Sequence, residues 1–365
     1  MRPNTRAILC LVLTTAIAAP VAAQESGGDS VPSLTFEEYE PRSTLVVPET
    51  PITRARFPFI DVHSHHRRLT PERLAEVVAA MDRLNMAALV NLSGGSGESL
   101  AGNVRLTSAY PGRFIHFANV DFDGIGEPGW SERAVARFEE DVRVHGAAGL
   151  KIFKNLGLDV RDGNGRVRTN DLRLDPLWAK AGELGVPVLI HTGEPSEFFA
   201  PHDRFNERWL ELEQFPNRAR PPEEYPSWEE VMAEQHDVFR KHPGTTFINA
   251  HLGWMGNDLA RLGRLLDEYP NVVTEVAAVI AELGRQPRFA REFLIRYQDR
   301  VLFGKDTFAE EEYHTYLRLF ETADEYFPYF RRRHAFWRMY GIDLPDEVLR
   351  KLYSENARRL IPGFD

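Results

Sequence analysis

Short apolar runs alternate with longer stretches of helical periodicity along most of the chain. Eight of these runs have the length and composition of buried strands. They are Phe57–His63, Ala87–Leu92, Arg113–Val120, Ala148–Phe153, Pro187–His191, Thr245–His251, Asn271–Ala277 and Arg300–Asp306. The pattern therefore predicts eight strands, each followed by a helical stretch.

The first helical stretch shows the signals that define such an element. In "LTPERLAEVVAAMDRL", Thr70 is placed to cap the helix, and Pro71 occupies the first helical position. The apolar residues that follow recur at spacings of three and four, which puts them on one helical face. They are Leu74, Val77, Val78, Met81 and Leu84. This stretch is expected to be a helix that packs on the strands.

Eight parallel strands with crossover helices close into a (β/α)₈ barrel of the TIM type. The alternative is a doubly wound open sheet, which the strand count disfavours. One barrel domain is expected over 57–365, with long loops after some strands. Barrels of this length commonly form a single domain.

The N-terminus has a different composition. Residues 1–23 combine Arg2 and Arg6 with an apolar run and end in "VAA", which is the layout of a signal peptide. The apolar run is shorter than the roughly 20 residues that a membrane span needs, so no stable membrane insertion is expected after cleavage. We expect secretion, with a periplasm as the assumed destination. Residues 24–56 are rich in Pro, Ser, Thr and Glu and predict a tether or surface strap.

Charge and cysteine content limit the class of partner and the kind of metal ligand that we expect. The formal charge is −10, and it becomes −12 without 1–23, which carries Arg2 and Arg6 and no acidic residue. An acidic chain without basic clusters argues against a nucleic-acid partner. The single cysteine, Cys10, lies in the predicted signal peptide, so a metal in the mature protein must be held by nitrogen and oxygen.

Histidines gather where the predicted strands end. His63 and His65 are two residues apart at the end of the first strand, so their side chains point to the same side. His191, His251 and Asp306 end three later strands. The carboxyl ends of barrel strands form the active site in such enzymes. Two imidazoles aimed at one point are half of a metal site, although a lone His-x-His pair is weak evidence.

Several motifs together resemble the amidohydrolase superfamily. They are "DVHSHH", "GLKIF", "PVLIHTGEP", "INAHLG", "VLFGKD" and "SENARRLIPG", and they extend from about Phe59 to the C-terminus. The most similar branch is the amidohydrolase-related group that includes amino-carboxymuconate-semialdehyde decarboxylase and resorcylate decarboxylases. No single motif is specific, but their ordered combination is.

The resemblance implies a divalent metal, most often one zinc ion. Carried over to this sequence, the ligands are His63, His65, His191 and Asp306. His251 and Asp306 would then act on protons or on bound water. The alternative is a two-metal site in which carbamylated Lys151, at the end of the fourth strand, bridges the ions and His251 is also a ligand. Lys305 departs from the family, which often has a small residue before the aspartate.

Arginines near the barrel mouth are candidates for binding a substrate carboxylate. Arg204 and Arg208 lie in a long segment after the fifth strand, Glu194–Pro216, which we expect to fold over the pocket as a lid. Arg285 follows the seventh strand. The alternative is that these arginines pair with the abundant glutamates nearby. The glycine-rich turn Ser93–Ser99 could cradle an anion, but a plain turn is the simpler interpretation.

Three functions fit the sequence. The first is a secreted hydrolase that uses metal-activated water on an amide, a lactone or a related carbonyl compound. The second is a non-oxidative decarboxylase or hydratase of an aromatic or enol carboxylic acid. The third is an inactive binding protein on a decayed barrel. A small molecule, in particular a carboxylic acid, is the expected partner, and the resemblance is compatible with a homodimer.

Overall fold

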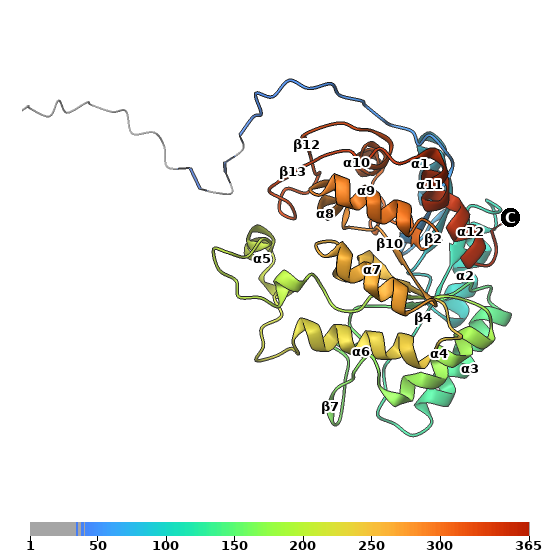
Figure 1. Ribbon diagram of the computed structural model, residues 1–365. Coiled ribbons are helices and arrows are strands. Elements are labelled where there is room, and N and C mark those ends of the chain that lie inside the picture. Colours follow the sequence, from blue (N-terminus) through green and yellow to red (C-terminus); the bar gives the residue numbers. More distant parts are fainter. Residues whose placement is uncertain (1–33, 36–37, 40, 365) are drawn as a thin grey trace, which may run out of the picture. The chain divides into compact units, whose positions relative to one another are not determined.

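The computed structural model describes residues 34–35, 38–39 and 41–364 (Figure 1). The predicted signal peptide 1–23 lies outside the described residues. Leu45–Asp365 forms one compact unit, and Met1–Thr44 is a separate one. Part of the predicted strap therefore belongs to the compact unit, and Thr50 fixes it by donating two hydrogen bonds of 2.7 and 2.8 Å to Asp324. Among the described residues, no helix is both long and apolar enough to span a membrane.

Parallel strands form the centre of the compact unit. One sheet has the order β1 (Phe59–Ser64), β2 (Met86–Asn91) and β3 (Phe114–His116). The other has the order β11 (Val301–Leu302), β10 (Val272–Glu275), β9 (Phe247–Asn249), β8 (Val188–Ile190), β5 (Leu150–Ile152) and β4 (Ala118–Asn119). Since Phe117 alone separates β3 from β4, these two pieces are halves of one barrel strand.

Hydrogen bonds close both seams between the sheets. Phe117 N–H donates to Asn91 O, and Ala118 N–H donates to Gly149 O, at 3.1 and 2.9 Å. At the other seam, Val62 N–H donates to Phe303 O at 3.0 Å, and a parallel bridge joins Ser64 to Asp306. The structure is therefore a closed (β/α)₈ barrel, which confirms the predicted fold class and excludes the open sheet.

Helices surround the strands (Figure 1). The helices after the successive barrel strands are α1 (Pro71–Leu84), α2 (Gly97–Thr107), α3 (Trp130–Arg143), α4 (Asp175–Glu183), α6 (Trp228–Lys241), α7 (Leu259–Glu268), α9 (Pro287–Arg296) and α10 (Glu310–Glu321). Shorter helices are α5 (Trp209–Gln214), α8 (Ile280–Gly284), α11 (Asp346–Arg350) and α12 (Asn356–Leu360). Two small antiparallel ribbons pair β6 (Arg161–Asp162) with β7 (Gly165–Arg166) and β12 (Phe327–Pro328) with β13 (Arg338–Met339).

The α1 prediction is confirmed in detail. The Thr70 side chain accepts a hydrogen bond from Arg73 N–H, and Pro71 begins the helix. The apolar face identified in the sequence is buried. Thr70 satisfies a backbone donor that would otherwise be orphaned, and the buried face holds the helix on the barrel.

The apolar core has two parts. Side chains such as Val62, Leu189 and Ile248 fill the barrel interior, and Ile361, just after α12, packs against them. A larger cluster, with Trp178 and Phe247 among its buried members, lies between strands and helices. Because side chains alternate along each strand, the same strands supply both parts. These apolar side chains fill the interior, and the buried polar residues His63, His251 and Glu275 lie at or just after the carboxyl ends of β1, β9 and β10.

Acid should destabilise this fold through buried neutral histidines. Burial lowers the pKa of His116 and of His236 from 6.5 to about 4. Because these folded-state values lie below the unfolded value, the unfolded chain binds more protons between pH 4 and 6.5, and stability falls as pH decreases through this window. At pH 5 each group costs about 2 kcal/mol. Urea midpoints at pH 7 and 5 should therefore differ less in His236→Phe than in the wild type, whereas an equal difference would contradict this account.

Candidate metal centre

Three side chains predicted as metal ligands converge at the carboxyl ends of the strands. Asp306 Oδ1 lies 3.6 Å from His63 Nε2 and 3.4 Å from His65 Nε2. The ligand atoms of these three residues all lie within 4.8 Å of one another. His63 is fully buried, whereas the side chains of His65 and Asp306 are 21% and 32% exposed. The group is therefore open on one side, toward the barrel mouth.

The backbone at the seam between the first and last strands brings these residues together. Asp306 N–H donates to His63 O at 2.6 Å, and Asp306 adopts φ 85°. Asp61 Oδ1 accepts from the N–H groups of both His63 and Lys305, at 2.9 and 3.1 Å. The other oxygen of Asp61 accepts from Tyr313 OH at 2.6 Å. One buried carboxylate thus connects the segment that carries the His-x-His pair to the segment that carries Asp306.

Glu275 fixes the ring of His63. His63 Nδ1 donates to Glu275 Oε1 at 2.9 Å, and His251 N–H donates to the same oxygen at 2.7 Å. The other oxygen, Oε2, accepts from Ala277 N–H. With Nδ1 protonated, the Nε2 lone pair of His63 is left free, and this buried atom has no hydrogen-bond partner among the described residues. Such a carboxylate–histidine pair is the usual support of a metal-binding imidazole.

A second hydrogen-bonded chain fixes the ring of His191. His251 Nδ1 lies 2.8 Å from Ala277 O and donates to it, and in the neutral form of a ring with this tautomer Nε2 is an acceptor. His191 Nδ1 lies 3.3 Å from that Nε2 and therefore carries the shared proton. The Nε2 atom of His191 is left buried with a free lone pair and no partner among the described residues. The rings of His63 and His191 have centroids 6.4 Å apart.

The protonation states of the group suit a cation. Burial lowers the pKa of His65 to about 4 and the pKa values of His63 and His191 well below 6.5. Burial acts to raise the pKa of Asp306, but the ionisable groups facing it, His63 foremost, lower it below 3.8. At neutral pH the group therefore offers neutral imidazoles and a carboxylate. These are donors that divalent metals accept, and the orphaned Nε2 atoms show that the residues fit such an ion.

Aromatic rings border the site. The Phe153 ring lies 5.8 Å from that of His65, and the half-buried Trp254 ring stacks on His251 at 4.5 Å. Trp254 also lies 5.6 Å from the ring of His191. Its contacts depend on positive φ angles at 251–254, which turn the chain sharply after β9. Sequence reasoning did not assign a role to Trp254, although it directly follows "HLG".

Two of the predicted substrate-binding arginines are committed to ion pairs. The guanidinium of Arg208 is buried and lies 3.2 Å from both Glu211 and Glu282. Arg285 pairs with Glu282 at 2.8 Å and with Glu207 at 2.9 Å. The alternative considered for these arginines, pairing with nearby glutamates, is therefore what the structure has. These ion pairs connect the loop that contains α5 to the segment that contains α8.

Within the part of the chain that the structure describes, Arg204 makes no ion pair. Its guanidinium lies 4.8 Å from the ring of Phe205, which is 77% exposed. The predicted lid contains α5 (Figure 1). None of the three arginines belongs to the group that converges on His63.

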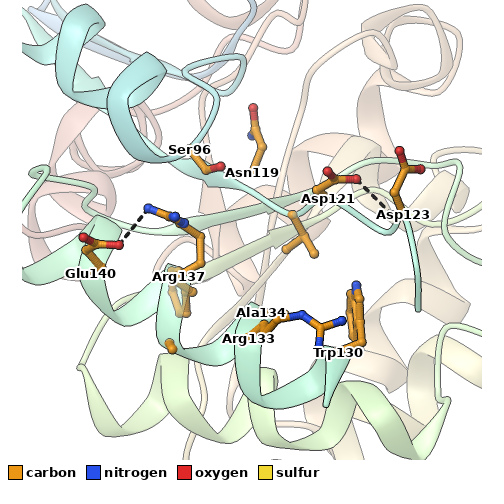
Figure 2. A pocket seen from close by; sticks show the side chains of 12 residues that line it. Ser96, Asn119, Asp121, Asp123, Trp130, Arg133, Ala134, Arg137 and Glu140 are labelled. Carbon is orange, nitrogen blue, oxygen red and sulfur yellow. Dashed lines mark hydrogen bonds and ion pairs between the residues drawn. The ribbon is translucent and has the colours of Figure 1, made fainter. Parts of the chain in front are cut away.

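A separate cavity of about 470 Å³ lies beside the barrel between the loop after β2, the end of β4 and α3 (Figure 2). Asp121 and Asp123 face it on one side and Arg133 and Arg137 on the other, with Arg137 paired to Glu140 at 2.7 Å. None of the converging metal-site residues lines this cavity.

Backbone donors of the glycine-rich turn at the edge of this cavity bind side chains of the protein. Gly95 N–H donates to Asn119 Oδ1 at 2.9 Å, and Gly97 N–H donates to Asp141 Oδ1 at 2.6 Å. These backbone donors are already used within the protein. Ser93, at the start of the turn, instead lies 2.8 Å from His65 Nδ1 and orients that ring.

The barrel and the donor set at its strand ends define a metal-dependent (β/α)₈ enzyme. The family model Amidohydro_2, described as amidohydrolase, matches residues 55–363, and the chain belongs to this family. The resemblance to the amidohydrolases that the motifs predicted is therefore confirmed at the level of this family. No curated protein matches the chain.

Solved structures with the same fold include two decarboxylases. A 2,6-dihydroxybenzoate decarboxylase in complex with 2,6-dihydroxybenzoate is 15% identical, with a TM-score of 0.50 over 83% of this chain and 99% of that one. A dihydroxybenzoic acid decarboxylase from Polaromonas sp. JS666, with manganese and 2-nitroresorcinol bound, is 13% identical, with a TM-score of 0.52 over 83% and 96%. An uncharacterised TIM-barrel protein from Bordetella bronchiseptica is 16% identical, with a TM-score of 0.50 over 83% and 98%.

Proposed function

We propose that this protein is a metal-dependent, non-oxidative decarboxylase of a small aromatic or enol carboxylic acid. The observation that carries the proposal is the convergence of His63 Nε2, His65 Nε2 and Asp306 Oδ1 on the open side of the barrel. The decarboxylases that share the fold support the choice of reaction. Hydrolysis of an amide or a lactone, the first expectation from the sequence, has less support from these relatives and becomes the alternative.

His63, His65, His191 and Asp306 would hold one divalent cation, for which zinc is the proposed identity. The cation supplies positive charge that stabilises a substrate oxyanion. Glu275 and His251 hold the imidazoles in the tautomers that expose Nε2. Because both ring nitrogens of His251 are engaged, we assign it the orientation of His191 rather than contact with substrate.

The proposed reaction breaks the bond between the ring carbon and the carboxylate carbon. The electron pair of that bond stays with the ring, and CO₂ leaves. A proton from water then takes the place of the carboxylate on the ring carbon. We assign delivery of this proton to Asp306, since its side chain is 32% exposed while those of His63 and Glu275 are fully buried. The rings of Phe153 and Trp254 give the site flat apolar walls that suit an aromatic acid.

A product assay on the metal-loaded protein tests the proposal. A panel of hydroxybenzoates, beginning with 2,6-dihydroxybenzoate, is incubated in D₂O, and CO₂ and ring deuteration are measured. CO₂ release with one deuterium on the vacated carbon supports decarboxylation. Turnover of lactones or amides with oxygen from H₂¹⁸O in the product, and no CO₂ from the acids, would replace it by hydrolysis. Mass spectrometry of the same sample gives the metal and its stoichiometry.

Glu275→Gln should weaken metal binding by about 10- to 100-fold, which is the usual cost of losing such a supporting carboxylate. The neutral amide no longer stabilises the protonated Nδ1 of His63 or selects the tautomer that exposes Nε2. Competition with a chelating dye measures the affinity. Glu234→Gln is the matched control, because Glu234 is also a buried glutamate but pairs with Arg166, at 2.6 Å. Equal metal affinity in both variants would contradict the assigned role of Glu275.

A further inference from the structure

Lys151 lies on the face of β5 that points into the barrel. It is the central residue of β5 and pairs in register with Leu189 of β8, whose side chain belongs to the barrel interior. Its neighbours Leu150 and Ile152 pack instead in the cluster between strands and helices. Lys151 is fully buried, so its ammonium group lies inside the barrel and out of contact with solvent.

The ammonium group of Lys151 has no hydrogen-bond partner among the described residues. The Phe153 ring centroid lies 5.4 Å from Nζ, and the same ring borders the metal-site histidine His65. Burial lowers the pKa of Lys151 from 10.5 to about 7, and the protonated form is, after burial, the largest cause that lowers the pKa values of His63 and His65. A buried amine without a hydrogen-bond partner is costly, and proteins retain one mainly where function requires it.

The carboxylates near Lys151 are already committed to other groups. Glu275 accepts from His63, from His251 N–H and from Ala277 N–H, and Asp306 Oδ1 faces His63 and His65. Those two carboxylates would also balance a divalent cation, so neither is left to pair with the Lys151 amine when the site holds its metal.

The other buried cations of the described residues are all paired. Arg208 and Arg220 each contact a buried glutamate at 3.2 and 3.3 Å, and Lys305 contacts Glu312 at 2.5 Å. Lys151 is the exception among them, because its amine has no hydrogen-bond partner among the described residues.

We propose that Lys151 is the anion receptor of this site and donates to an anionic oxygen of the substrate. The inference rests on the proposed function for its location, and it narrows the substrate to an oxyacid in preference to a neutral amide or lactone. Two kinds of substrate oxygen can accept this hydrogen bond: a carboxylate oxygen and the ring oxygen beside the carboxylate. Contact with the carboxylate would contribute to binding. Contact with the ring oxygen would stabilise the charge that moves onto the ring as CO₂ leaves.

The test compares a charged ligand with its neutral counterpart. Calorimetry on the metal-loaded wild type, Lys151→Met and Lys154→Met measures the affinities of 2,6-dihydroxybenzoate and 2,6-dihydroxybenzamide. The wild type should prefer the acid, and Lys151→Met should reduce that preference by about 10- to 100-fold, the value of a charged hydrogen bond. Lys154→Met is the control, because this lysine lies three residues away but pairs with Glu194 at 2.5 Å, and its preference should stay unchanged.

Binding is measured without turnover, so this result is independent of whether CO₂ release is found. If the wild type does not prefer the acid, or if Lys151→Met keeps the preference, the inference is wrong. Where turnover is found, a loss confined to KM in Lys151→Met assigns the contact to the carboxylate, and a loss confined to kcat assigns it to the ring oxygen.

Metal content and thermal stability test whether Lys151→Met loses its ligand preference only because its structure is disturbed. Lys151→Met should retain the wild-type metal content and unfold at a higher temperature, since the substitution replaces an unpaired buried charge by an apolar side chain of similar length. Two metal ions per wild-type chain, with one lost in Lys151→Met, would instead make Lys151 a carbamylated bridge between metals and would overturn the proposal.

Discussion

Asp306→Asn should reduce turnover by about 10²- to 10⁴-fold, the usual contribution of a positioned proton-transfer group. The neutral amide cannot carry the proton that we assign to Asp306, and it is a weaker metal ligand than the carboxylate. Asparagine is the appropriate replacement because Asp306 adopts φ 85°, a left-handed conformation that asparagine tolerates better than alanine. The backbone bond from Asp306 N–H to His63 O should therefore survive.

Steady-state kinetics and metal analysis of the same samples check this prediction. The matched control is Asp346→Asn, because Asp346 is exposed and pairs with Arg56 at the surface, at 2.8 Å. The control should keep wild-type turnover. Full activity of Asp306→Asn with metal still bound would remove Asp306 from the mechanism and leave the proton delivery unassigned.

Gly304→Ala should damage the site and the fold together. A Cβ atom at this position would lie 2.6 Å from Glu275 Oε2 and 3.0 Å from His63 Cβ. Neither neighbour can move freely, because Glu275 is held by three hydrogen bonds and His63 lies within β1. The expected cost is about 1–3 kcal/mol of stability, as for other overpacked sites, and weaker metal binding through the displaced Glu275.

Urea unfolding of the apo and metal-loaded forms measures both effects. Gly102→Ala is the control, because this residue lies inside α2 with nothing within 4 Å of the added Cβ. That variant should gain about 0.5–1 kcal/mol from the lower entropy of its unfolded chain. Wild-type stability and metal affinity in Gly304→Ala would show that the end of the last strand can adapt, contrary to the close packing described above.

The proposals assign substrate binding, the orientation of the metal ligands and proton transfer to different neighbouring groups. Lys151 selects an anionic substrate, Glu275 and His251 select histidine tautomers, and Asp306 moves the proton. Each role predicts a different measured change: ligand charge preference for Lys151, metal affinity for Glu275 and turnover for Asp306. Because the three readouts differ, one failed prediction does not remove the others.

Local sequence patterns were sufficient for the barrel and for the converging part of the candidate site. Apolar runs and helical periodicity identify strands and helices, because burial in a barrel imposes these spacings. The separation of His63 from His65 puts both rings on one side, and the position of Asp306 at a strand end brings it to the same mouth. These features depend on neighbours in sequence or on the topology of the fold alone.

The remaining features depend on contacts between residues far apart in the chain. Only the tertiary structure shows that Glu275 holds His63, that Arg208 is occupied by Glu211 and Glu282, and that Trp254 stacks on His251. No spacing rule could have chosen these partners among the many charged and aromatic residues of this chain.

Lys151 illustrates both what the sequence shows and what only the tertiary structure shows. Its strand position was evident from the sequence, but the absence of a partner for its ammonium is a property of everything packed around it. The sequence by itself determined the barrel and the residues that point to its mouth, because strand periodicity and parallel topology are enough to direct them there. Only the tertiary structure decided which of those groups are satisfied and which remain free for a ligand, because hydrogen-bond pairing is settled by packing in three dimensions.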